Sequence, residues 1–205
     1  MLVKVIMTPV EKLTVLHLTD TAQHAVDLIS KNNFLSLPVV DGKKYAGYLS
    51  KQFIYDQYFE GNNGTIQDFL KKPVSDFVRA KVEPVTVDTP VEQAAHIFFT
   101  NKLRFIPVTD KDNNLVGIVT QNALFGIITK TYGLKDPKVS IYTDNFSGVL
   151  SKIADTIAKS GGNITNIAQL DTEVMGIQEI HIRFKANDVD KIVRKLEERG
   201  YKVRL

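Results

Sequence analysis

The sequence contains few side chains whose type and spacing suit catalysis. Four histidines fall in separate segments, none in the H-x-x-x-H or H-E-x-x-H spacing of a metal site: His17, His24, His96 and His181. Cysteine is absent, which excludes thiol nucleophiles, disulfides and thiolate-bound metals. The G-x-S-x-G nucleophile turn, the Walker phosphate loop and a dinucleotide glycine motif are absent as well. We therefore expect no enzymatic activity, no metal site and no resident cofactor.

Two basic residues stand where they could hold an anion. Lys102 and Arg104 come just before the apolar run IPV, and their positive charge would suit a phosphate group. The alternative is that both are solvated side chains at the end of a helix. Residue type alone leaves both interpretations open.

The composition is that of an ordinary folded protein. Of the 205 residues, 43% are hydrophobic and 24% are charged, so a core of normal size is available. The net charge of +3 is weak and spread along the chain, which does not indicate nucleic-acid binding. No apolar run approaches the roughly 18 residues that span a bilayer. We expect a cytoplasmic protein whose partners are neither nucleic acids nor membranes.

An internal repeat supplies the elements that would position the basic pair. The segment AVDLISKNNFLSLPVVDGKKYAGYLSKQFI, which begins at Ala25, recurs from Ala94 as AAHIFFTNKLRFIPVTDKDNNLVGIVTQNAL. Each copy predicts a short strand, a helix, two strands and a second helix, because the apolar spacing changes in that order. The preceding segments KVIMTP, ending at Pro9, and DFLKKP, ending at Pro73, also resemble each other. Units this short should pack against each other and leave clefts at the seam.

The pattern changes from Lys138 onward. Residues 138–143 are β-branched and aromatic, which predicts a strand, and residues 147–160 carry apolar side chains at helical spacing. Two strands, a second helix and a last strand over residues 201–205 follow. The order β-α-β-β-α-β is ferredoxin-like, so the predicted fold class of the chain is α+β.

These patterns resemble two known families. The leading I-M-T-P, the central L-P-V and the closing G-h-h-[ST] are similar to a tandem pair of CBS domains, the Bateman module. The turn Asp144–Gly148 before VLSKIADTIAKSGGNI resembles an ACT domain, although Ser147 stands where that family usually has proline. A CBS pair followed by an ACT domain is the order of AcuB-like proteins. The resemblance implies CBS domains at residues 1–64 and 65–133 and an ACT domain at residues 138–205.

The resemblance to a CBS pair implies nucleotide sites between the repeats. Such families bind adenine nucleotides through G-h-h-[ST]-x-x-D, whose hydroxyl contacts phosphate or ribose and whose carboxylate holds the ribose 2′- and 3′-hydroxyls. Here Phe53 and Ala123 replace both carboxylates. The positions expected to contact a nucleotide are Ser50, Thr120, Pro38, Pro107, Gly47, Gly117, Lys102 and Arg104.

Three interpretations of these clefts stay open. In the first, AMP or ATP binds through Ser50, Thr120, backbone groups and apolar walls. In the second, the ligand is cyclic di-AMP, whose 3′-oxygen is esterified and so cannot donate a hydrogen bond to an aspartate that would bind a free diol. Some Bateman-type receptors for cyclic di-AMP resemble this chain in having T-x-x-A at this position. In the third, the clefts are empty and the pair is only a dimerisation scaffold.

The ACT resemblance implies binding of small molecules, usually amino acids, at a subunit interface. The matching positions are Asp144, Gly148 and Asn163, where a glycine would let backbone amides approach a carboxylate at a helix N-terminus. The simpler alternative is a helix cap at Asp144 and a turn at Gly148. Because both modules commonly self-pair, we expect a homodimer. The whole chain is then a non-catalytic sensor that signals to an unidentified protein partner.

Overall fold

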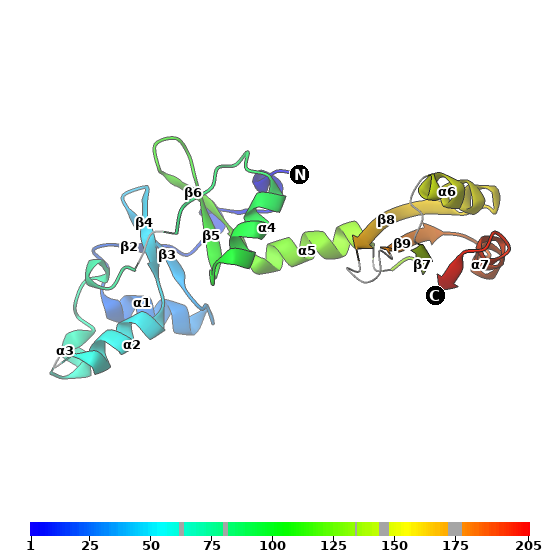
Figure 1. Ribbon diagram of the computed structural model, residues 1–205. Helices are drawn as coiled ribbons and strands as arrows, with labels where there is room; N and C mark the ends of the chain where they lie inside the picture. Colours follow the sequence, from blue (N-terminus) through cyan, green and yellow to red (C-terminus); the bar gives the residue numbers. More distant parts are fainter. Residues whose placement is uncertain (62–63, 80–81, 134, 144–147, 172–177) are drawn as a thin grey trace. The chain divides into compact units, whose positions relative to one another are not determined.

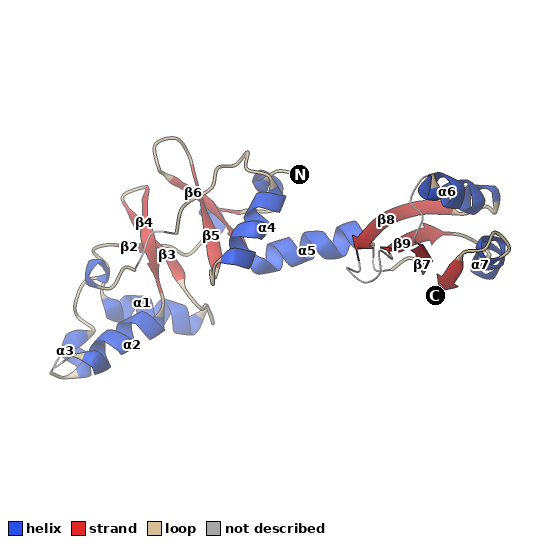
Figure 2. Cartoon of the chain, in the orientation of Figure 1, coloured by secondary structure: helices blue, strands red, loops and turns tan. Residues whose placement is uncertain are grey.

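The computed structural model describes every residue except 62–63, 80–81, 134, 144–147 and 172–177 (Figure 1). The chain folds as two compact units, residues 1–125 and 126–205. The helices of the first unit are α1 Ala22–Lys31, α2 Lys51–Glu60, α3 Ile66–Phe69, α4 Val91–Thr100 and the start of α5 Gln121–Tyr132. Its strands are β1 Thr8–Pro9, β2 Leu16–His17, β3 Leu37–Asp41, β4 Lys44–Leu49, β5 Phe105–Thr109 and β6 Leu115–Thr120 (Figure 2).

The two repeats of the first unit form two small sheets. The first repeat has the strand order β2-β3-β4, and the second repeat has β1-β6-β5. Strand β2 is parallel to β3, and its counterpart in the second repeat is a single parallel bridge between Val85 and Val108. Strands β3 and β4 form an antiparallel hairpin, as do β5 and β6. The predicted order of elements is therefore confirmed in both copies.

The segment that precedes each repeat packs against the other repeat. The Val3 amide donates to the Thr89 carbonyl at 2.8 Å, and the Val74 amide donates to the Asp20 carbonyl at 2.7 Å. Both segments form short 3-10 helices, Val3–Val5 and Val74–Asp76. The sequence comparison, which matched Pro9 with Pro73, was wrong, since the equivalent segments are these two 3-10 helices. Matching KVIMTP with DFLKKP compared stretches that occupy different places.

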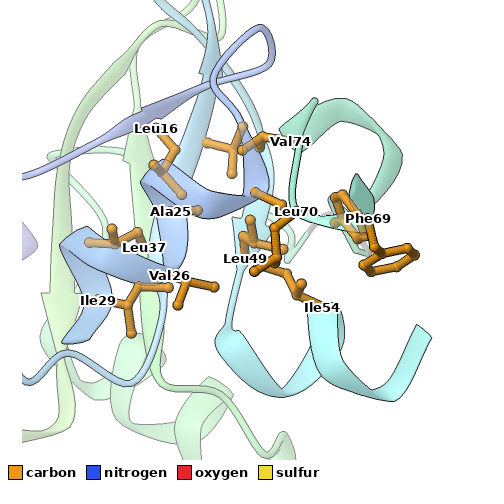
Figure 3. Packing of buried hydrophobic residues seen from close by; sticks show 13 residues of the cluster. Leu16, Ala25, Val26, Ile29, Leu37, Leu49, Ile54, Phe69, Leu70 and Val74 are labelled. Carbon is orange, nitrogen blue, oxygen red and sulfur yellow. The ribbon is translucent and has the colours of Figure 1, made fainter. Parts of the chain in front are cut away.

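The core of the first repeat forms between α1, α2 and the sheet (Figure 3). Helix α1 begins at Ala22 because the Thr21 hydroxyl accepts from the His24 amide at 3.2 Å, as an N-cap does. Figure 3 shows Ala25, Val26 and Ile29 of α1 facing the strands, with Phe69, Leu70 and Val74 from the segment after α2 nearby. Burial of each large aliphatic side chain stabilises this core by roughly 1.5–3 kcal/mol.

The tips of the two hairpins join the repeats. The Tyr45 amide donates to the Asn113 carbonyl and the Leu115 amide donates to the Lys43 carbonyl, both at 2.9 Å. The Tyr45 ring is buried against Val40 and Leu115, and burial raises the pKa of its hydroxyl well above the usual value. The copies therefore pack together as their length predicts, with a seam between them.

The second unit is a four-stranded antiparallel sheet with two helices on one face. Its elements are β7 Lys138–Thr143, α6 Val149–Lys159, β8 Asn163–Asp171, β9 Gln178–Lys185, α7 Val189–Glu197 and β10 Lys202–Arg204. The strand order is β10-β7-β9-β8. Buried side chains of both helices, including Ile153 and Ile192, pack against Ile180, Ile182 and Phe184 of β9. This arrangement confirms the predicted ferredoxin-like β-α-β-β-α-β domain and the α+β fold class.

Candidate functional site

Two clefts border the loop of residues 33–36, which connects α1 with β3. One cleft holds about 450 Å³ and contains Thr120, and the other holds about 480 Å³ and contains Ser50. We call them the Thr120 cleft and the Ser50 cleft. Both volumes lie within the range of small-molecule sites, roughly 300–1,000 Å³.

Each cleft has a hydroxyl at the start of a helix. The Ser50 hydroxyl accepts from the Phe53 amide at 3.3 Å and caps α2, and the Thr120 hydroxyl accepts from the Ala123 amide at 3.2 Å at the start of α5. A hydroxyl that accepts in this way still has its proton to donate. The free amides and the dipole of a helix N-terminus also favour an anion. Both hydroxyls are therefore placed to contact a negatively charged group.

Cations line both clefts. Lys12 borders the Thr120 cleft, Lys51 and Lys102 border the Ser50 cleft, and Arg104 borders both. Among the described residues that line the two clefts there is neither aspartate nor glutamate. Charge-assisted hydrogen bonds to phosphate are the strong interactions that such a lining can offer.

The structure brings five of the eight predicted nucleotide contacts to the clefts. Those in the Ser50 cleft are Ser50, Lys102 and Arg104, and those in the Thr120 cleft are Thr120, Pro38 and again Arg104. The other three are buried in strands and lie outside the lining of both clefts: Gly47, Pro107 and Gly117.

The two glycines make room for neighbouring chain. A Cβ atom on Gly47, whose φ is +147°, would lie 2.5 Å from Val78 Cγ1, and one on Gly117 would lie 2.6 Å from the Thr8 carbonyl oxygen. These approaches come from the segments that follow the two 3-10 helices, at the strand edges β4 and β6. In this chain the glycine of G-h-h-[ST] is thus required by the close approach of a neighbouring segment, through the Val78 side chain at Gly47 and the Thr8 backbone at Gly117.

An aromatic wall occupies the position of the first missing carboxylate. The Phe53 ring lies edge-on to the Tyr48 ring at 5.4 Å between centroids, and the Arg79 guanidinium stands 5.1 Å above it. Both rings line the Ser50 cleft. At the second position, Ala123 is outside the lining of the Thr120 cleft, and Gln121 and Asn122 line it instead. An aromatic ring therefore stands where the motif has its first carboxylate, and at the second site the amides of Gln121 and Asn122 line the cleft beside Ala123.

Sequence analysis missed several lining residues. Lys12 was not predicted, because it belongs to the N-terminal segment that completes the second repeat, and no local pattern reveals that crossing. Gln121 and Asn122 directly follow Thr120, so the motif itself could have suggested them. Ser36 lines both clefts, and its buried hydroxyl has no hydrogen-bond partner among the described residues.

The predicted amino-acid site of the second unit is described in part. Gly148 is the N-cap of α6 with a left-handed φ of +72°, and Asn163 is exposed at the start of β8, opposite Lys185. Asp144 lies outside the described residues. The role of these three positions stays a prediction.

A polar cluster lies on the sheet face opposite α6 and α7. The Tyr142 hydroxyl donates to Glu179 Oε1 at 2.9 Å, and His181 Nε2 lies 2.7 Å from the same oxygen. The hydrogen bond with His181 has the largest effect on Glu179 and lowers its pKa. Burial raises the pKa, and the hydrogen bond from Tyr142 lowers it again, so the pKa of Glu179 stays below its usual value. The described residues contain no group of three acidic or histidine side chains arranged to hold a metal ion.

Comparison with known families agrees with the two units. Residues 3–52 and 74–130, more than half of the chain, match the CBS domain family. The chain belongs to the CBS-domain family. Residues 139–200 match the AHAS small subunit-like ACT domain, so an ACT-like domain follows the CBS pair, as the sequence predicts. Both are regulatory, non-catalytic modules.

Curated relatives match part of this chain at low identity. This CBS-domain chain is 28% identical to inosine-5′-monophosphate dehydrogenase of Methanocaldococcus jannaschii over 102 residues, which cover 49% of the chain and 18% of the enzyme. It is 24% identical to the uncharacterized protein MJ1004 of the same organism over 139 residues, 66% of the chain and 61% of the relative. The chain thus spans less than two thirds of the length of either relative.

Solved structures of CBS-domain proteins match the CBS pair. CBSX2, crystallised in complex with AMP, is 26% identical with a TM-score of 0.56, and the match covers 63% of this chain and 96% of CBSX2. CbpB in complex with c-di-AMP is 23% identical with a TM-score of 0.57, over 63% of this chain and 85% of CbpB. The second likeness shows the shared fold alone. Within the described residues, no helix has the length and hydropathy to cross a membrane.

Proposed function

We propose that this chain is a regulatory sensor whose CBS pair binds an adenine nucleotide, AMP or ATP, in its clefts. The observation that carries the proposal is the chemistry of the clefts. Each has a helix-capping hydroxyl and cationic side chains, with no acidic residue among its described lining. The complex of CBSX2 with AMP supports adenine as the base.

The phosphate group is the part of the ligand that these clefts recognise. In the Ser50 cleft it binds at the N-terminus of α2, where the Ser50 hydroxyl and the positive charges of Lys102 and Arg104 favour it. The base packs against the rings of Tyr48 and Phe53, because an aromatic face stacks well on a nucleobase. In the Thr120 cleft, Lys12 and Arg104 serve the phosphate and the amides of Gln121 and Asn122 serve the sugar or base.

Cyclic di-AMP is the second candidate ligand. The observation that favours it is again the absence of Asp and Glu among the described lining residues. A phosphodiester is not repelled there, and the site has no carboxylate that would need the free ribose diol of a mononucleotide as its partner. A chain that binds neither kind of nucleotide would instead be a dimerisation scaffold. Titration with nucleotides separates the sensor from the scaffold, and one substitution at the second motif position separates AMP or ATP from cyclic di-AMP.

The test is isothermal titration of the whole chain with AMP, ATP and cyclic di-AMP, in the wild type and in Ala123→Asp. We expect micromolar or tighter binding of a mononucleotide by the wild type. Ala123 lies just outside the lining of the Thr120 cleft, one residue after Asn122, so the test uses the longer aspartate side chain to bring a carboxylate toward the ribose. In Ala123→Asp that carboxylate should strengthen AMP binding by about tenfold, since hydrogen bonds to a charged group contribute roughly 1.5–3 kcal/mol. The same negative charge should weaken the binding of cyclic di-AMP, because it repels the phosphodiester. The matched control Ala123→Asn should leave both affinities near those of the wild type.

Two results would decide against the proposal. If the chain binds cyclic di-AMP but neither AMP nor ATP, and Ala123→Asp weakens this binding, the ligand is the cyclic dinucleotide and not a mononucleotide. If none of the three nucleotides binds, nucleotide sensing is contradicted, and a role as a dimerisation scaffold is left.

The ACT-like domain completes the sensor. Bound nucleotide favours one packing of the two repeats, and the resulting shift is limited by the difference in affinity between the two packings. In our proposal the domain self-pairs into a homodimer or binds an amino acid at Asp144, Gly148 and Asn163, and the output goes to a protein partner in the cytoplasm. Light scattering with and without nucleotide would detect the dimer, and a monomer in both conditions would contradict it.

A further inference from the structure

The two clefts are not separate pockets, because they share a wall. Five residues line both of them: Asn33, Phe34, Leu35, Ser36 and Arg104. Four of the five form the loop between α1 and β3 in the first repeat. The fifth, Arg104, comes from the second repeat, directly before β5. The shared wall is thus built from both repeats at their seam.

Arg104 is the one cation among the described lining residues that reaches both clefts. Lys12 lines the Thr120 cleft alone, and Lys51 and Lys102 line the Ser50 cleft alone. Lys51 already donates to the Ser30 hydroxyl at 3.3 Å. Arg104 is exposed, and in the part of the chain that the structure describes it forms no ion pair. Its guanidinium group is therefore open to a ligand from either side.

A single guanidinium group cannot serve two phosphates equally well. Its five N–H donors lie in one rigid plane, so turning a bidentate edge toward a phosphate in one cleft turns that edge away from the other cleft. A phosphate bound in one cleft uses this edge and adds negative charge beside the other cleft. A second phosphate then meets both a missing donor and a like charge.

The wall also has a reason to rearrange. The Ser36 hydroxyl is buried without a hydrogen-bond partner among the described residues, and an unpaired buried donor is costly. A shift of the loop between α1 and β3 around the first ligand would change the shape of both clefts together.

We propose that the two clefts of one chain compete for Arg104, so that the first phosphorylated nucleotide weakens binding of the second. The first ligand enters the Ser50 cleft, where Lys51 and Lys102 add to the charge of Arg104. A nucleoside without phosphate does not bind the Arg104 guanidinium group, so it should bind to the two clefts independently. This inference rests on the proposed function and adds the coupling between its two sites.

The experiment is isothermal titration of the whole chain with AMP and with adenosine at constant ionic strength. If the earlier titration selects ATP or cyclic di-AMP, that nucleotide replaces AMP. We expect two unequal AMP steps, the second weaker by about tenfold, which corresponds to about 1.4 kcal/mol. Adenosine should show only the difference in affinity that the unlike linings of the two clefts cause. In Arg104→Gln the first AMP step should weaken, and the gap in affinity between the two steps should become narrower than in the wild type.

Two lysine variants serve as matched controls. Lys12→Gln and Lys102→Gln each remove a charge from one cleft only, so each should weaken one step and keep the steps unequal. Two equal AMP steps in the wild type would overturn the coupling and leave the proposed function standing. A gap between the two steps that is as wide in Arg104→Gln as in the wild type would also overturn it, because Arg104 would then not couple the clefts. Absence of all nucleotide binding would overturn the proposed function itself, and this inference with it.

Discussion

The two repeats of the CBS pair share an order of elements but differ in what covers their helices. In the first repeat, Phe69, Leu70 and Phe77 from the segment after α2 are buried against α1 and α2. In the second repeat, Phe99 of α4 and Phe125 of α5 are 89% and 61% exposed. The difference shows that a sequence repeat sets the elements, whereas the segments between the copies decide which surfaces become core.

The largest expected effect separates a buried from an exposed phenylalanine. Phe77→Ala should lower the free energy of unfolding by about 3–5 kcal/mol, because it removes a fully buried ring that packs on Phe69 at 5.3 Å. The control Phe99→Ala should change it by about 0.5 kcal/mol or less. Urea unfolding followed by circular dichroism measures both. Equal losses would mean that the two repeats are covered alike.

The next effect tests the close approach at the second repeat. Gly117→Ala should destabilise the chain by about 2 kcal/mol, because the new Cβ atom would lie 2.6 Å from the Thr8 carbonyl oxygen. Gly126→Ala is the control, since nothing lies within 4 Å of a Cβ atom there and alanine favours a helix. Melting temperatures compare the two. A harmless Gly117→Ala would contradict the pairing of β1 with β6.

A smaller effect distinguishes the first helices of the two repeats. Thr21→Ala should cost about 1 kcal/mol, because the Thr21 hydroxyl caps α1, whereas α4 begins after Pro90 and has no side-chain cap. Thr21→Ser keeps the hydroxyl and should restore most of the loss. Chemical unfolding of both variants measures the difference, and an unchanged Thr21→Ala would show that the cap does not stabilise α1.

The smallest effect contrasts the ACT-like domain with the CBS pair. The pKa of Glu179 is lowered in the folded chain, so its stabilising contribution is present above the ordinary value of 4.5 and is lost as the pH falls toward the folded value. Glu179→Gln should cost about 0.5 kcal/mol near pH 7 and should reduce the acid sensitivity of unfolding.

The exposed residue Glu197 provides the control for this last variant. Glu197→Gln should leave the pH dependence as it is in the wild type. Parallel pH profiles for the wild type and Glu179→Gln would contradict a role for the cluster of Tyr142, Glu179 and His181. Thermal unfolding between pH 3 and pH 8, roughly the range in which carboxyl groups and histidine titrate, measures all three proteins.

Local patterns in the sequence predicted most of the fold. The helix and strand order of both units follows from apolar spacing, whereas Ser50 and Thr120 were expected only as nucleotide contacts, and their role as helix caps became visible in the structure. Periodicity tells which face of an element is apolar, but not which segment will cover it. The crossing of Val3–Val5 and Val74–Asp76 to the opposite repeats was missed for this reason.

The candidate site was predictable to the same extent. Lys102 and Arg104 were identified because they lie beside a recognisable strand, and Pro38 because it belongs to the repeated motif. Lys12 was missed, since it reaches the Thr120 cleft only through the long-range pairing of β1 with β6. The shared wall was missed too, because two clefts meeting at one arginine is a property of the packed pair and not of either repeat.

The central claim is that the CBS pair recognises the phosphate of an adenine nucleotide. The most direct test compares AMP with adenosine by titration of the same protein at low and at high salt. The account predicts that AMP binds more tightly by about tenfold or more, and that the gap narrows as salt screens the exposed cations. Equal affinities for AMP and adenosine, or a gap that salt leaves unchanged, would contradict it.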